Sequence, residues 1–288
     1  LIAILLFCVL DNLIYYCSEL KQYQLDITLS LVILWVYLHY LATPSSNRFL
    51  SLLFCGVISV WFSHSIIFVI ATIGVHFLYK SYSQGNLKNA VFINFFWWIS
   101  FGSVYLLSTI HINKSSGLKV FWKTSFMPIT PSGFMEIIWL PLNLFRLSCY
   151  YLGLRLSNIS YQIDPILEKS FSAQLQIYLN NWAAFSYILF FGLVVFSVFL
   201  YGIYSLYRNN KRFFVLLIGP LIFTLIASSL EKYPFRGRLL LFYFPFMTIV
   251  ISYSINQILS KISILNLSTT LKKSISYSLI ICVFFSSY

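Results

Sequence analysis

The sequence predicts an all-α, polytopic membrane protein, and three observations lead to this fold class. The chain of 288 residues is 59% hydrophobic and only 9% charged, whereas a soluble domain carries about 25% charged residues. Several apolar runs approach or exceed the ~18–20 residues that a helix needs to cross a bilayer. Alternating segments of about ten residues, which would indicate a transmembrane barrel, do not occur in the sequence.

The apolar runs predict about nine membrane segments in a helical bundle. They cover residues 1–16, 24–42, 49–62, 65–79, 90–110, 183–207, 213–230, 239–258 and 274–288. Residues 49–79 are long enough for one tilted span, but Ser63 and His64 in the middle favour two short helices joined by a polar turn. The first and last runs reach the ends of the sequence, so we expect the chain to be a fragment of a longer protein.

Residues 111–182 interrupt the pattern, because this stretch is too polar to span a membrane and too long for a simple loop. We therefore expect three regions. Residues 1–110 hold transmembrane helices with an outer polar cluster, residues 111–182 form an extracytoplasmic loop region, and residues 183–288 hold the C-terminal helices with an outer arginine loop. The amphipathic, aromatic stretch FMEIIWLPLNLFRL in the middle region predicts short helices that lie in the membrane interface.

The basic residues on the short connections predict the orientation of the helices. One set of alternate connections carries nine lysines and arginines and the other set carries four. The more basic set is expected to be cytoplasmic, since Lys and Arg are enriched on that side. Three of the four cations on the outer set fall within EKYPFRGR, residues 231–238, where they oppose the topology signal and are more typical of a functional site.

The first candidate polar stretch is NLIYYCSELKQYQLD. If its second half is helical, Glu19, Gln22, Tyr23 and Asp26 share one face, and Lys21 points elsewhere. Two carboxylates two turns apart can order a cation, a sugar or a basic partner. The alternative is that the charges are solvated in a loop and that Asp26 stabilises the positive N-terminus of a helix.

The second candidate stretch is EKYPFRGR, in which Pro234 and Gly237 break the helix. Arg236 and Arg238 are thereby placed at the membrane rim, where a guanidinium fork suits phosphate oxygens. Snorkelling toward lipid head groups is the alternative, and it is the reading we prefer for Lys232. Arg238 directly precedes an apolar run and is expected to lie deepest, so it is the residue for which we favour a specific anionic partner.

His64 lies in the turn WFSH on the same predicted side. It can act as a proton carrier or as a hydrogen-bond partner of a sugar, although a lone histidine in a turn is more often structural. The five cysteines and four histidines are scattered, so no metal site is predicted. A divalent cation stays an open alternative as a cofactor, but the acidic residues are not spaced convincingly for it.

The order of several short motifs resembles the bacterial membrane glycosyltransferases of the GT-C superfamily, near the protein O-mannosyltransferase and aminoarabinose transferase group. The motifs are IYYCSELKQYQLD, WFSH, FWW with a following tyrosine, FWKTSFMP with a following Pro-Ser pair, and YPFRGRLLLF with a following proline. The resemblance spans residues 12–250. It rests on the ordered set, because no single motif is diagnostic.

The resemblance implies an inverting enzyme that transfers a sugar from a polyprenyl-phosphate donor to a glycan, lipid or protein acceptor on the outer face of a bacterial inner or cell membrane. Membrane lipids are then its surroundings, and nucleic acid is not a partner. The principal catalytic acid of the family lies in the first outer loop, which is expected upstream of Leu1.

Individual positions acquire expected roles from the same resemblance. Arg238 matches the arginine that is expected near the lipid phosphate, and Glu19, Lys21 and Tyr23 match a second polar cluster that faces the same cavity. Glu19 is the candidate auxiliary base within this chain. Asp26 matches a residue common in similar proteins but without an assigned role.

Arg236 departs from the family pattern, because it replaces the first glycine of YPFGGR. Two other functions remain open. A transporter or flippase for a lipid-linked or anionic sugar would use the same charged residues, and so would a polymerase or ligase of surface polysaccharide.

Overall fold

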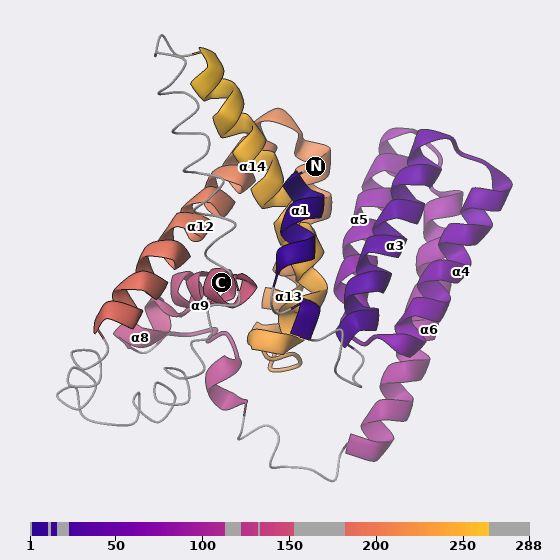
Figure 1. Ribbon diagram of the computed structural model, residues 1–288. Coiled ribbons are helices and arrows are strands. Elements are labelled where there is room, and N and C mark those ends of the chain that lie inside the picture. Colours follow the sequence, from indigo (N-terminus) through magenta and orange to yellow (C-terminus); the bar gives the residue numbers. More distant parts are fainter. Residues whose placement is uncertain are drawn as a thin grey trace. The chain divides into compact units, whose positions relative to one another are not determined.

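The computed structural model describes residues 2–10, 13–15, 23–112, 122–131, 133–152 and 182–264 (Figure 1). These residues form helices and connecting segments, without a strand. Six helices are long and apolar enough to cross a membrane: Tyr23–Ala42, Ile66–Ser83, Lys88–Ser108, Leu189–Asn209, Lys211–Ser229 and Gly237–Ser263. The predicted all-helical membrane class is confirmed at this level. The expected segment 274–288 and most of residues 111–182 lie outside the described ranges.

The helices group into two compact units, each assembled from separate stretches of the chain. The first unit comprises Leu1–Ser18, Ile138–Asn209 and Met247–Tyr288, and the second comprises Glu19–Ile137 and Asn210–Phe246.

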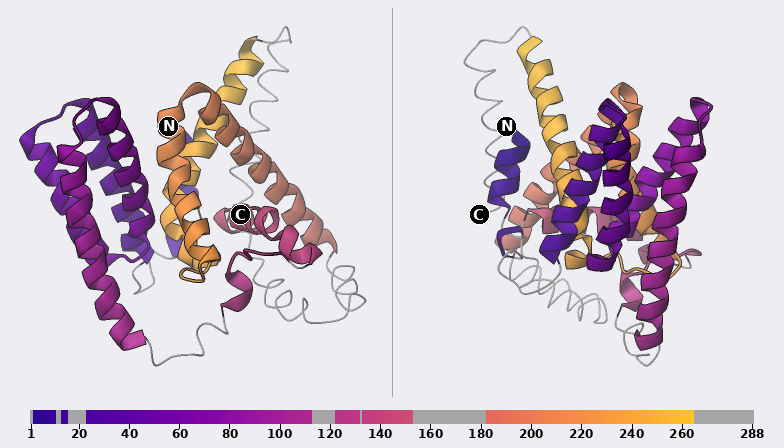
Figure 2. Two further views of the ribbon diagram at one scale, coloured as in Figure 1. Left: turned by 180° about the vertical axis from the view of Figure 1, so that it is seen from behind. Right: turned by 90° about the vertical axis from the view of Figure 1, so that its right-hand side faces the viewer.

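In the described part of the second unit, five long helices pack side by side (Figures 1 and 2). These are α3 (Tyr23–Ala42), α4 (Ser46–Phe62), α5 (Ile66–Ser83), α6 (Lys88–Ile112) and α13 (Lys211–Ser229). α3 packs on α4 and α5, α4 packs on α6, and α5 packs on α13. The 3₁₀ segment η2 (Gly237–Tyr243) packs on α3.

Local sequence signals set the ends of these helices. Ser45 caps α4 by accepting a hydrogen bond from the Arg48 amide, and Asn210 caps α13 by accepting one from the Phe213 amide. Ser63 accepts the Ile66 amide at 3.2 Å and so begins α5. Such side-chain oxygens satisfy amides that have no partner in the first helical turn. The polar turn therefore divides residues 49–79 into two helices, as predicted.

Arg48 has a structural role at the end of α3. Its Nη1 donates to the carbonyl oxygens of Thr43 at 2.9 Å and of His39 at 3.3 Å. These carbonyls belong to the last turn of α3 and to the connection after it, where helix geometry leaves acceptors unsatisfied.

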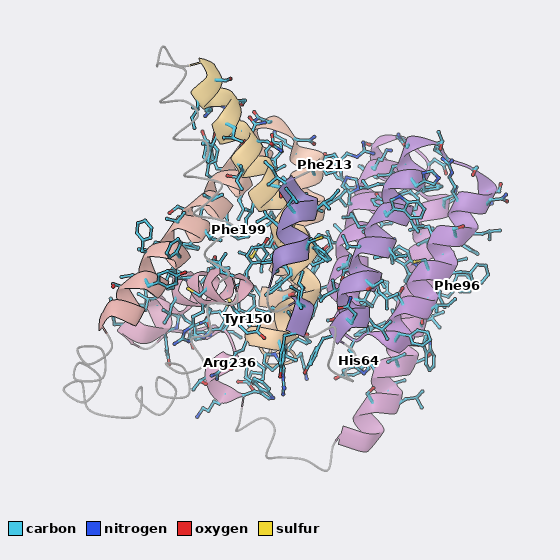
Figure 3. The ribbon with its side chains drawn as sticks, viewed as in Figure 1. His64, Phe96, Tyr150, Phe199, Phe213 and Arg236 are labelled. Atoms are coloured by element: carbon cyan, nitrogen blue, oxygen red, sulfur yellow. The ribbon has the colours of Figure 1, made fainter. Side chains whose placement is uncertain are left out.

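Because successive helices run in opposite directions, the connections of the second unit fall at its two ends. We call the end with residues 43–48, 80–88 and 210–212 the basic end, and the end with Tyr23, residues 63–65 and residues 230–238 the Asp26 end. Figure 3 shows His64 and Arg236 near one end of the unit and Phe213 near the other.

The first unit contains α1 (Ile2–Val9), α9 (Trp139–Tyr151), α12 (Trp182–Asn209) and most of α14 (Phe244–Ile264). α12 contacts α9 where Gly192 faces Cys149, and it approaches α14 where Gly202 faces the Val250 carbonyl. The buried Tyr151 hydroxyl bonds to Thr248 Oγ1 at 3.0 Å.

The predicted helix 239–258 differs in one respect from the structure. Its first part is the 3₁₀ segment η2, and the regular helix α14 begins only at Phe244. Pro245 lies in the first turn of α14, where its missing N–H costs no hydrogen bond.

Candidate functional site

Five of the predicted site residues lie at the Asp26 end of the second unit. Tyr23 and Asp26 are in the first turns of α3, His64 is in the turn between α4 and α5, and Arg236 and Arg238 flank the start of η2. Glu19 and Lys21 lie outside the described residues. The fold thus collects at one end residues that are more than 200 positions apart in the sequence.

Asp26 is the unusual group of this site. Its side chain is only 6% exposed, although it belongs to a helix that is apolar enough to span a membrane. Oδ1 is buried and has no hydrogen-bond partner in the described part of the chain. The hydroxyls of Ser63 and Ser65 are the polar side chains beside the carboxylate. A buried carboxyl group with an unpaired oxygen is costly in such a helix and is typical of a functional position.

Buried and exposed side chains alternate in the turn between α4 and α5. Ser63 and Ser65 are buried and their hydroxyl oxygens are 3.2 Å apart, whereas His64 between them is exposed. The two serines therefore face Asp26 while the imidazole points away from the buried cluster. His64 is at the predicted end of the bundle but does not join the Asp26 cluster.

Tyr233 belongs to the arginine loop, residues 231–238, and connects this loop to the Asp26 cluster. Its hydroxyl donates to the Leu239 carbonyl at 2.7 Å, and its ring packs edge-on against Phe68 with centroids 4.8 Å apart. Burial raises the pKa of the Tyr233 hydroxyl well above its ordinary value; the charges of Asp26 and Tyr23 raise this pKa further, and the Ser65 hydroxyl lowers it. Tyr233 is therefore a neutral donor close to Asp26 and to Ser65.

Arg238 directly precedes Leu239, whose carbonyl accepts the hydrogen bond from Tyr233. Its guanidinium carbon is 5.8 Å from the centre of the Tyr23 ring, a cation–π contact between η2 and the first turn of α3. Tyr23 is 9% exposed, whereas the Arg238 side chain is exposed. Arg238 is thus oriented by an aromatic ring and still open to an anionic partner. Arg236 is only partly buried and lies on the same loop (Figure 3).

The arginine loop itself has a defined backbone. The Lys232 amide bonds to the Ala227 carbonyl at 2.9 Å and the Glu231 amide to the Ser228 carbonyl at 3.0 Å, which is the Schellman pattern at the end of α13. Glu231 has φ of 55° and Gly237 has φ of 46°. A left-handed glutamate is unusual because glycine normally occupies this position.

A second segment braces this loop. The Ser125 carbonyl in η1 (Lys123–Ser125) accepts the Phe235 amide at 2.9 Å and the Ser228 hydroxyl at 3.5 Å. Ser228 Oγ in turn accepts the Met127 amide at 3.0 Å. The predicted motif FWKTSFMP therefore contacts the predicted motif YPFRGR at the Asp26 end.

Sequence reasoning missed three members of the cluster, namely Ser63, Ser65 and Tyr233. The only available signal was the Ser-His-Ser pattern in a polar turn, which is common in loops. In the described residues, no group of three histidine, cysteine or acidic side chains is placed to hold a metal ion.

Comparison with models of protein families, with characterised proteins and with solved structures finds no match to this chain. The Asp26 end combines a buried carboxyl group, neutral hydroxyl donors and an exposed, oriented arginine at the ends of apolar helices. This combination offers hydrogen-bond donors and a positive charge, which suit a polar ligand that carries an anionic group.

Proposed function

We propose that this chain belongs to a membrane glycosyltransferase of GT-C type, which transfers a sugar from a polyprenyl-phosphate donor to an acceptor at the Asp26 end. The observation that carries the proposal is the placement of Arg238. The Arg238 side chain makes a cation–π contact with Tyr23, is exposed, and lies where the apolar segment that leads into α14 begins. The tail of a lipid-linked sugar stays in hydrocarbon while its sugar meets water, so the phosphate between them lies at this boundary. A cation at the boundary can bind that negative charge.

The reaction requires two kinds of help from the protein. The acceptor oxygen attacks the anomeric carbon, the bond between that carbon and the phosphate oxygen breaks, and the bonding electrons leave with the phosphate. The acceptor proton passes to a base. Arg238 stabilises the charge that develops on the leaving phosphate, since a guanidinium binds phosphate oxygens in a fork. Glu19 is the proposed auxiliary base.

Asp26 acts in this proposal as a positioning residue. The carboxylate lies beside Ser63 and Ser65, Ser65 lies near Tyr233, and Tyr233 bonds to the carbonyl that follows Arg238. This chain of polar contacts fixes the turn and the loop relative to α3. It supports a site in which Arg238 is held in place before the donor binds.

The proposal is tested by exchanging Arg238 in the full-length protein, reconstituted with a polyprenyl-phosphate sugar. Arg238→Gln is expected to lower transfer roughly 100-fold, because one charged contact in the transition state contributes about 3 kcal/mol. Arg238→Lys keeps the positive charge but lacks the forked guanidinium, so its rate should lie between those of Arg238→Gln and the wild type.

Lys232→Gln is the matched control, since it removes an exposed cation from the same loop and should leave transfer within about twofold of wild type. Equal rates for Arg238→Gln and the control would rule out the phosphate role.

A transporter or flippase for a lipid-linked sugar is the second candidate. A buried hydrogen bond of 2.6 Å between Tyr37 of α3 and His76 of α5 favours this second candidate. The bond places a titratable group between two helices that are apolar enough to span a membrane. If the protein moved a labelled lipid-linked sugar across the liposome membrane without forming a new glycosidic bond, transport would be favoured over sugar transfer.

A further inference from the structure

The closest approach of α5 and α13 determines which side chains meet at the basic end. A Cβ on Gly219 of α13 would overlap the Thr72 side chain of α5, so these two positions lie at the same level. The two helices are antiparallel, because α5 starts at the Asp26 end and α13 starts at the basic end.

Helix geometry then places two cations at the same level of the bundle. From Thr72 to Lys80 the chain rises about 12 Å, and from Gly219 back to Arg212 it rises about 10 Å in the same direction. Lys80 and Arg212 therefore lie at the same level on adjacent helices. In agreement with this, the Arg212 charge acts electrostatically on Lys80 and also on His76, one turn further into the bundle.

No carboxylate in the described ranges balances this pair. The three described acidic residues of the chain are Asp26, Glu136 and Glu231. Asp26 and Glu231 belong to the Asp26 end, and Glu136 is in α8 (Phe134–Ile137), beyond η1. The described cations of the basic end also include Lys88 and Lys211. Like charges at the same level of adjacent helices repel each other, and an anion bound between them would offset this repulsion.

The side chains around Lys80 and Arg212 indicate which kind of anion would bind there. Tyr79 and Tyr82, on either side of Lys80, are each 73% exposed, and Phe213 and Val215 after Arg212 are exposed as well. Exposed tyrosines at the end of an apolar helix are typical of the membrane interface. Apolar surface next to paired cations suits a molecule with a charged head and an acyl chain, and a free phosphate ion would leave that surface unused.

Buried side chains fill the space between Lys80, Arg212 and the interior of the bundle. His76 is buried and hydrogen-bonded to Tyr37, which is fully buried between α3 and α5. An anion at Lys80 and Arg212 would thus remain at the surface of the bundle.

We propose that Lys80 and Arg212 form a binding site for the phosphate of an anionic lipid head group, at the basic end and separate from the Arg238 site. The guanidinium binds two phosphate oxygens as a fork and the ammonium adds a point charge. Tyr79 and Phe213 border the acyl chains. The site is independent of the proposed sugar transfer.

The test is retention of lipid by the purified full chain in native mass spectrometry, with phosphatidylglycerol and phosphatidylcholine offered at equal concentrations. Wild type should retain phosphatidylglycerol preferentially. The double variant Lys80→Gln/Arg212→Gln should bind it roughly 25-fold more weakly, from about a fivefold loss for each cation. Lys232→Gln at the Asp26 end is the control and should bind as wild type does.

The charge-conserving variant Lys80→Arg/Arg212→Lys distinguishes lost binding from lost folding, since it should restore retention to near the wild-type level. Excess inorganic phosphate distinguishes the two sources of the anion and should displace little lipid. Equal retention of both lipids by wild type would overturn the proposal. Undiminished retention of phosphatidylglycerol by the double glutamine variant, or its displacement by free phosphate, would also overturn it.

Discussion

At the scale of single residues, Asp26 shows how a membrane helix can tolerate a carboxyl group. It is buried, one of its oxygens has no hydrogen-bond partner among the residues that the structure describes, and its neighbours are serine hydroxyls. In the described ranges no lysine or arginine forms an ion pair with it. A group kept in this state costs stability, which is the usual sign that its chemistry is needed.

Asp26→Asn tests that interpretation. The substitution keeps the shape and removes the buried charge, so the thermal midpoint of the protein in detergent should stay unchanged or rise by a few degrees. Sugar transfer should fall, because the neutral amide no longer fixes Ser63 and Ser65 in the same way. A markedly lower midpoint for Asp26→Asn would instead identify Asp26 as a structural residue.

At the scale of elements, the bundle depends on close contacts between helices. Gly56 of α4 faces the indole of Trp97 in α6, which is fully buried and donates from Nε1 to the Leu53 carbonyl at 3.1 Å. A Cβ on Gly56 would overlap this ring. Small residues at such positions allow helices in a membrane to approach closely, where packing provides most of the attraction.

Gly56→Ala should therefore destabilise the contact between α4 and α6 by about 1–3 kcal/mol, since the indole must move and its hydrogen bond weakens. Gly102→Ala is the matched control, because it adds the same methyl group to α6 at a position where no atom beyond its own stretch of helix lies within 4 Å. The control should be neutral or slightly stabilising, since alanine favours a helix. Equal unfolding midpoints for the two variants would contradict the packing argument.

At the scale of the whole molecule, each compact unit is built from separate stretches of sequence. Residues 19–137 form a unit with residues 210–246, so α13 packs on α5 although α12 lies between them in the sequence. This arrangement brings the arginine loop to the same end of the second unit as Asp26. The sidedness of that unit is a direct consequence of its antiparallel helices.

Sidedness across the membrane is testable with single cysteines in a cysteine-free background. The charge count predicts that His64→Cys is labelled by an impermeant maleimide from outside intact cells, and that Asn86→Cys is labelled only after permeabilisation. Both side chains are exposed at opposite ends of the second unit. Labelling of both from one side would be inconsistent with helices that cross the membrane, and the reverse pattern would invert the orientation.

Much of the second unit could be predicted from local signals. The apolar runs locate α3, α5, α6 and α13, and the Ser63-His64 turn separates α4 from α5. The 3₁₀ start of the last segment could not be predicted, because it depends on how η2 packs against α3 and on the bond from Tyr233 to Leu239. The end of α5 was likewise misjudged, because the helix continues for one polar turn (Lys80–Ser83) beyond the apolar run that ends at residue 79.

The sequence by itself determined that this protein is helical and belongs in a membrane, because composition and the length of apolar runs depend only on local residue content. It also singled out Tyr23, Asp26 and Arg238. Only the tertiary structure decided that Arg238 makes a cation–π contact with Tyr23, that Asp26 is buried beside Ser63 and Ser65, and that Arg212 acts electrostatically on Lys80. Those relations depend on which helices pack together, and packing between distant segments leaves no periodic trace in the sequence.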